Sequence, residues 1–171
     1  MNSKPATIAA ILFFIFFAWR LIAITSTDNP YDQTLASDQF IDMDGYKVSL
    51  DRYKGDYVWL DYAAEWCSYC VAQIRAIQSL EKRFDNEVLF ITVIAGTDKV
   101  MEKPHIASAQ QWISRFSLDP DKVLLKFSTN TLPYHVLYSP EGEILYQGSG
   151  LLNEEKITGL INKNRPSTER H

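Results

Sequence analysis

DYAAEWCSYC, residues 61–70, contains both cysteines of the 171-residue chain, Cys67 and Cys70. The segment before it, YVWLDY at 57–62, is apolar and aromatic and reads as a buried strand. After it, apolar residues recur at helical spacing, at Val71, Ile74, Ile77, Leu80 and Phe84. The two cysteines are therefore expected where a buried strand ends and a helix begins.

This position predicts redox chemistry for the cysteine pair. Unpaired backbone N–H groups and the helix dipole favour a thiolate on Cys67 at the start of the helix. The thiolate is the form that attacks a disulfide, so we predict Cys67 as the nucleophile. Cys70 lies one turn further on and is predicted to resolve the mixed disulfide. The redox-active Cys67–Cys70 disulfide then takes the place of a cofactor.

Half of a zinc site is the alternative for a C-x-x-C pair. A structural zinc site needs four ligands, usually with a second close pair of Cys or His. The other candidates are scattered, at His105, His135 and His171. Redox chemistry is therefore favoured over zinc, and no bound metal is predicted.

The segments on either side predict an α/β fold. Residues 40–50 alternate around Asp44-Gly45, which is typical of a β-hairpin, and 87–95 reads as a central strand. The pattern further predicts a helix at 104–116, a strand or helix at 123–127, a hairpin of 135–138 with 143–147, and a last helix capped by Asn153. We expect a three-layer fold: a mixed sheet, helices on both faces, and an added N-terminal β-hairpin.

Asp61 lies within the apolar strand, where an unpaired carboxylate is costly and burial raises its pKa. We predict that it accepts and donates a proton for Cys70, directly or through water. The alternative is a solvated carboxylate on an edge strand.

DYAAEWCSYC resembles the active-site segment of thioredoxin and of membrane-tethered thioredoxin-like proteins of the bacterial envelope, some of which serve cytochrome c maturation. The resemblance covers about residues 40–161. It implies a buried acid at Asp61, a contact surface beside the disulfide at Trp66, and a cis-proline facing the disulfide at Pro133. Leu132 would offer its backbone to a substrate. Simple packing of Trp66 and an ordinary trans Pro133 remain the alternatives.

The sequence departs from the thioredoxin pattern in the residues around the cysteines. Ser68-Tyr69 replaces the usual Gly-Pro dipeptide between them, and Gln73 stands where the tethered reductases often carry an acid. Because the intervening dipeptide helps to set the reduction potential, the direction of electron flow stays open. A reductase is preferred, with a disulfide isomerase or oxidase as alternatives.

The amino terminus contains an uninterrupted apolar run, IAAILFFIFFAW at 8–19. Extended to 6–24, it would span about 28 Å as a helix, close to the thickness of a bilayer core. We predict a flank at 1–5, a transmembrane signal anchor at 6–24, a tether at 25–38, the thioredoxin-like domain at 39–163 and a flexible tail at 164–171. The domain would face the periplasm from the bacterial inner membrane; a cleaved signal and a soluble periplasmic domain are the alternative.

A net charge of −4 without a basic stripe argues against nucleic acid as a partner. The predicted substrates are thiols and disulfides of exported proteins, apocytochrome c among them, with electrons from a membrane dithiol donor. Two other hypotheses remain. One is a copper chaperone that uses both cysteines and His135; the other is a tethered interaction module without redox chemistry.

Overall fold

The computed structural model describes residues 39–96, 106–127 and 131–165. The chain divides into two units, Met1–Ala36 and Ser37–His171, and the described residues all belong to the second. Among them, no helix is long and apolar enough to cross a membrane. The predicted anchor at 6–24 and tether at 25–38 lie outside the described residues.

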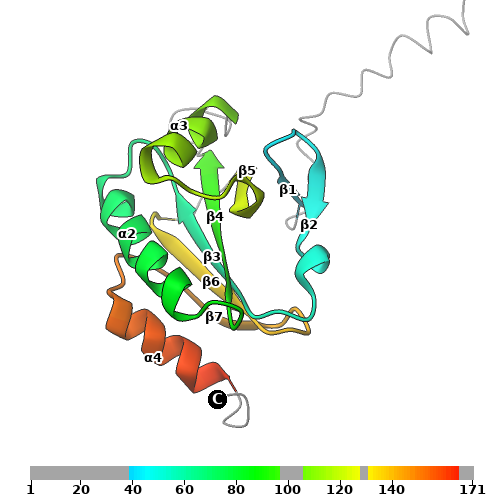
Figure 1. The fold of residues 1–171 in the computed structure, drawn as a ribbon, viewed down its shortest axis with the longest axis vertical. Helices are drawn as coiled ribbons and strands as arrows, with labels where there is room; N and C mark the ends of the chain where they lie inside the picture. Colours follow the sequence, from blue (N-terminus) through cyan, green and yellow to red (C-terminus); the bar gives the residue numbers. More distant parts are fainter. Residues whose placement is uncertain (1–38, 97–105, 128–130, 166–171) are drawn as a thin grey trace, which may run out of the picture. The chain divides into compact units, whose positions relative to one another are not determined.

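Seven strands form one mixed sheet in the order β2-β1-β5-β4-β3-β6-β7 (Figure 1). The central pairs β3·β4 and β4·β5 are parallel and the remaining pairs are antiparallel. The segment left undecided between strand and helix is therefore a strand. The bounds are Gln39–Ile41 (β1), Lys47–Ser49 (β2), Val58–Ala63 (β3), Leu89–Gly96 (β4), Val123–Phe127 (β5), Tyr134–Tyr138 (β6) and Ile144–Ser149 (β7).

The three described α-helices pack on the same face of the sheet: Ser68–Arg83 (α2), Ile106–Phe116 (α3) and Glu154–Asn164 (α4). Trp59 on β3 belongs to a buried cluster with residues of α2 and α4. Ala63, four residues later and on the same face of β3, belongs to a cluster with residues of α2 and α3. Figure 1 shows these helices on the side away from the β1–β2 hairpin. The mixed sheet is confirmed; among the described helices, the three α-helices share one face, and the other face has a short 3₁₀ helix.

The reason lies in the direction of the crossovers. The chain steps from β3 to β4 to β5 in one direction across the sheet, and right-handed crossovers then place both connecting helices on one side. The opposite face buries Leu60, Val93 and Leu124 together with Phe40 of β1. Leu50 and Tyr53, in the short 3₁₀ helix Leu50–Tyr53 (η1), also pack against it.

Both predicted hairpins are present, and each turns on a glycine. Gly45 has φ +88° and Gly142 has φ +89°, in the left-handed region that other residues avoid. Asp42 closes the first turn by accepting hydrogen bonds from the N–H groups of Asp44 and Tyr46, at 3.1 and 2.8 Å. The sequence therefore identified both turns from local chemistry alone.

Asn153 caps α4, as predicted, because its side-chain oxygen accepts a hydrogen bond from the N–H of Lys156 at 2.9 Å. The helix extends to Asn164, and the largely buried Arg165 forms an ion pair with Glu87. These two residues belong to the folded domain, beyond the boundary predicted at residue 163. The remaining tail, 166–171, lies outside the described residues.

The cap supplies a first test of the fold. Replacing Asn153 with alanine leaves an N–H group at the helix start without its partner, so the free energy of unfolding should fall by about 1 kcal/mol. Urea unfolding of the variant measures this change. Asn162→Ala, which removes an exposed asparagine from the same helix, is the matched control and should not show this loss.

Candidate active site

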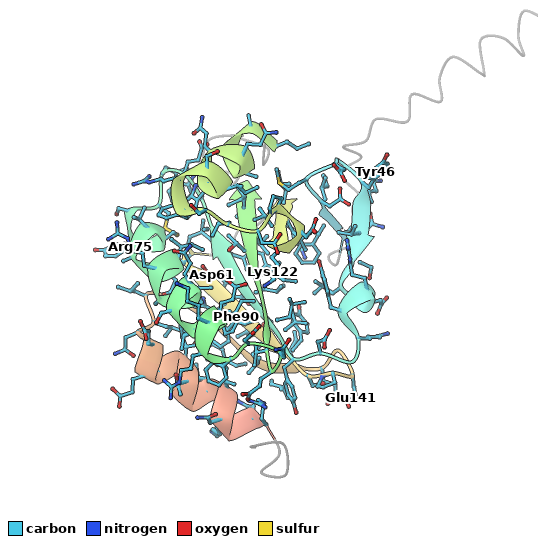
Figure 2. The ribbon with its side chains drawn as sticks, viewed as in Figure 1. Tyr46, Asp61, Arg75, Phe90, Lys122 and Glu141 are labelled. Atoms are coloured by element: carbon cyan, nitrogen blue, oxygen red, sulfur yellow. A yellow bond between two sulfur atoms is a disulfide. The ribbon has the colours of Figure 1, made fainter. Side chains whose placement is uncertain are left out.

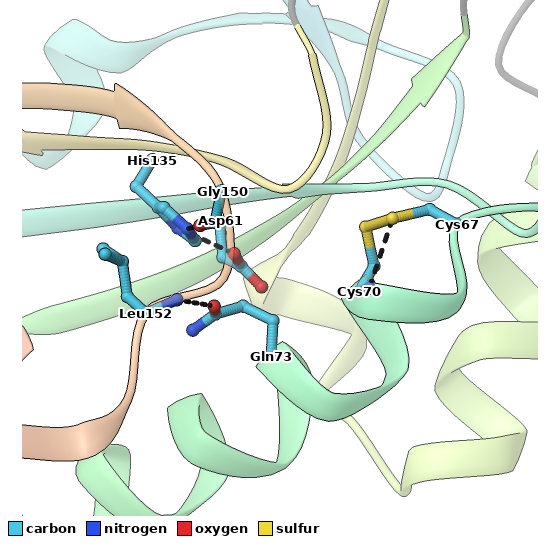
Figure 3. The surroundings of a disulfide bond; sticks show 7 residues. All are labelled: Asp61, Cys67, Cys70, Gln73, His135, Gly150 and Leu152. Atoms are coloured by element: carbon cyan, nitrogen blue, oxygen red, sulfur yellow. Dashed lines mark hydrogen bonds and ion pairs between the residues drawn. A yellow bond between two sulfur atoms is a disulfide. The ribbon is translucent and has the colours of Figure 1, made fainter.

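The cysteine pair lies at the first turn of α2, directly after β3. Cys67 is the N-cap residue, and its sulfur accepts a hydrogen bond from the N–H of Cys70 at 3.2 Å. The two sulfurs are bonded to each other as a disulfide (Figure 3). When the bond is reduced, the same N–H group stabilises a thiolate on Cys67. The placement predicted from the strand and helix patterns is therefore confirmed.

The disulfide is surrounded by apolar side chains. Cys67 is 4% exposed and Cys70 is fully buried. Their cluster comprises Ala63, Ala64, Ile74, Ile94, Ala109, Trp112, Val123 and Leu125. The neighbouring Trp66 and Tyr69 are instead 53% and 67% exposed. Trp66 is thus not a core residue, and two aromatic rings beside the disulfide are open to a protein substrate.

The Leu132–Pro133 segment lies beside the apolar cluster that contains the disulfide. Leu132 packs against the apolar cluster that contains both cysteines. The Leu132–Pro133 peptide bond is cis, as the resemblance to thioredoxins implies. The Pro133 carbonyl accepts a hydrogen bond from the N–H of Gly150 at 2.8 Å, which ties the segment to the end of β7. The roles of both residues in substrate binding stay predictions.

Asp61 is fully buried on the face of β3 that α2 covers, between Trp59 and Ala63. Figure 2 shows it inside the domain, whereas Arg75 on α2 lies at the surface. Burial raises the pKa of the Asp61 carboxyl group, and the neighbouring His135 opposes that rise. The edge-strand alternative is therefore wrong, because β3 lies between β4 and β6.

His135 is the partner that sequence reasoning did not assign to Asp61. The two residues face each other across the β3·β6 pair, and Nδ1 of His135 lies 3.0 Å from Oδ1 of Asp61. Nε2 lies 3.0 Å from the carbonyl oxygen of Gly150. The antiparallel register that creates this contact depends on how the strands align, which local patterns do not specify.

This arrangement does not support the copper alternative. Both ring nitrogens of His135 face oxygen atoms of the protein, and the side chain is fully buried. Within the described ranges, no group of three His, Cys, Asp or Glu residues could hold a metal ion. His105 and His171 lie outside those ranges.

Gln73 lies on α2, about one turn after Cys70. Its side chain is fully buried, and its Oε1 accepts a hydrogen bond from the N–H of Leu152 at 2.8 Å. This bond joins α2 to the segment that leads from β7 into α4 (Figure 3). The residue that stands in place of the acid of the tethered reductases is thus an uncharged structural link.

A disulfide at the start of a helix, following the central strand of a thioredoxin-like fold, defines a thiol–disulfide oxidoreductase. Residues 31–147 match the AhpC/TSA family, and the chain belongs to that family. It is similar to the thiol-disulfide oxidoreductase ResA of Bacillus subtilis, with 26% identity over 129 residues, 73% of this chain and 70% of ResA.

Solved structures support the same fold. The exposed lipoprotein thioredoxin Etrx1 of Streptococcus pneumoniae matches with a TM-score of 0.56 and 20% identity, covering 73% of this chain and 97% of that one. A secreted Mycobacterium tuberculosis disulfide oxidoreductase homologous to E. coli DsbE matches with a TM-score of 0.55 and 13% identity, covering 73% and 94%. At these identities the comparison shows a shared fold.

Proposed function

We propose that the protein is a reductase of disulfides in other proteins. The Cys67 thiolate attacks a substrate disulfide, whose sulfur–sulfur bond breaks as a mixed disulfide forms, and the first substrate sulfur leaves and takes up a proton. Cys70 then gives its proton to Asp61 and attacks Cys67, which releases the second substrate sulfur. Two electrons pass from the dithiol to the substrate, and the second proton follows from Asp61.

The apolar surroundings of the two sulfurs are the observation that supports electron flow from this protein to its substrate. A disulfide is neutral, whereas the reduced pair at neutral pH tends towards a thiolate. The Cys70 N–H group stabilises this thiolate for attack, but the apolar cluster leaves the reduced pair less stable than a polar site would. A destabilised dithiol gives up electrons readily, which suits a reductase.

The exposed surface around the disulfide suits a protein substrate. Trp66 and Tyr69 offer aromatic contact area, and Leu132 packs against the cluster that contains the cysteines. We infer that exported proteins, apocytochrome c among them, are the substrates and that a membrane dithiol donor restores the reduced pair. The apolar run at 8–19 supports a single-pass anchor in the bacterial inner membrane, with the domain in the periplasm.

The reduction potential of the purified full-length protein tests the direction. Equilibration with glutathione or dithiothreitol buffers should give a value near that of thioredoxin, about −270 mV, because the apolar cluster disfavours the thiolate. A value near that of DsbA, about −120 mV, would contradict the reductase and identify an oxidase. An intermediate value near that of protein disulfide isomerase, about −180 mV, would favour the isomerase alternative.

A further inference from the structure

The contacts of His135 determine how many protons the Asp61–His135 pair holds. The Gly150 carbonyl can only accept a hydrogen bond, so Nε2, 3.0 Å away, carries a hydrogen. In a neutral imidazole Nδ1 is then a bare lone pair, and it lies 3.0 Å from a carboxyl oxygen of Asp61. Two lone pairs repel at this distance. The contact is attractive when the pair holds one proton, either as an imidazolium beside a carboxylate or as a neutral imidazole beside a carboxylic acid.

The pair has few other polar neighbours. On α2, Figure 3 shows Cys70, which carries a thiol when reduced, and the uncharged Gln73 beside Asp61 in that view, and on β4 the uncharged Thr92 pairs with Asp61. On β7, Gly148 pairs with His135, and the Tyr146 hydroxyl lies over Gly148, 2.6 Å from the position that a Cβ atom would take there. On β3, the Trp59 ring packs against the His135 ring, with the two ring centroids 5.7 Å apart. Among the described residues, His135 is the ionisable group that opposes the rise in the pKa of Asp61.

We propose that His135 is a positioning residue of the thiol–disulfide exchange, which takes up the proton of Asp61 and so keeps that buried side chain able to accept the proton of Cys70. This inference rests on the proposed function. Without a partner, a buried carboxylic acid would stay protonated and could not act as a base. An imidazolium beside it makes the carboxylate form accessible in the interior.

The proton balance of the resolving step follows from this arrangement. The Cys70 thiol transfers its proton to the Asp61 carboxylate while Nδ1 of His135 keeps the shared proton. The pair gains one positive charge as Cys70 becomes a thiolate, so the charges within the buried site balance. When Cys70 bonds to Cys67, the leaving substrate thiolate takes the extra proton. Figure 3 shows Asp61 between the His135 ring and the disulfide in that view.

The pH dependence of disulfide reduction by full-length His135→Phe tests the role. Phenylalanine keeps an aromatic ring but holds no proton, so Asp61 should stay protonated at neutral pH. We expect the rate there to fall by about tenfold or more, and the pH of half-maximal rate to move up by about one unit or more. The rate should recover at higher pH, which damage to the fold would not allow.

The His135→Asn variant and the wild-type protein are measured in the same way, so that failure of the inference can be told from failure of the proposed function. His135→Asn can donate a hydrogen bond to Asp61 and should restore part of the rate at neutral pH. If His135→Phe exchanges disulfides with the wild-type pH profile, the inference fails while the proposed function stands. If the wild-type protein reduces no disulfide at any pH, the proposed function itself fails.

The ring-nitrogen NMR signals of His135 test the proton directly, without a variant at this position. His105→Gln and His171→Gln assign the signal by elimination. We expect a protonated Nε2, and an Nδ1 titration that shifts or disappears in Asp61→Asn. A bare Nε2, or a titration that Asp61→Asn leaves unchanged, would overturn the proposal.

Discussion

Replacing Cys67 with serine is expected to lower disulfide reduction by about a thousandfold or more, because a hydroxyl cannot form the mixed disulfide. The hydrogen bond from the Cys70 N–H stabilises whatever anion stands at this position, but serine stays protonated at neutral pH. The rate of reduction of a protein disulfide, followed with an excess of dithiothreitol as donor, measures the loss.

Cys70→Ser distinguishes the role of Cys67 from that of Cys70. Cys67 should still attack, but nothing resolves the product, so mixed disulfides with substrates accumulate and can be isolated by non-reducing electrophoresis. Ser79→Ala, at an exposed position further along α2 and away from the cysteines, is the matched control and should keep nearly full activity. Equal trapping by Cys67→Ser and Cys70→Ser would contradict the assignment of the nucleophile.

Asp61→Asn is expected to make the protein slower and more stable at once. The amide cannot accept the Cys70 proton, so reduction near neutral pH should fall by about a hundredfold. The amide also removes the buried carboxyl group, and its NH2 can donate a hydrogen bond to Nδ1 of a neutral His135, so no charge is left unpaired. The free energy of unfolding of the oxidised protein near neutral pH should therefore rise by an amount on the order of 1–3 kcal/mol.

The sign of the stability effect follows from the raised pKa of Asp61. The folded state binds this proton more tightly than the unfolded chain does, so the protonated acid adds stability at pH below its ordinary pKa of 3.8. That contribution is lost as the pH rises through the higher folded pKa. The advantage of Asp61→Asn should therefore shrink towards about pH 4.

Urea unfolding of the wild-type and variant proteins across this pH range measures the effect. Asp121→Asn is the matched control, because Asp121 is exposed and should show neither the gain in stability nor the loss of activity. A destabilised, inactive Asp61→Asn would show that the carboxyl group serves the packing of the fold rather than proton transfer.

The sequence by itself determined the elements that depend on local chemistry. The helical spacing after Cys70 predicted α2, and Asp44-Gly45 and Gly142 predicted the two hairpins, because their backbone conformations favour glycine. The apolar strand before Cys67 and the helical spacing after Cys70 also placed the cysteine pair at a helix start, where free N–H groups are a local property of the helix.

The tertiary structure alone decided what depends on the alignment of distant strands. The β3·β6 register brings His135 to Asp61, although their residue numbers differ by 74 (135 − 61). The order of the strands places all three described helices on one face, which the order of elements along the chain did not indicate. Contacts across a sheet follow from strand order and register, and both result from packing of the whole domain rather than from any short segment.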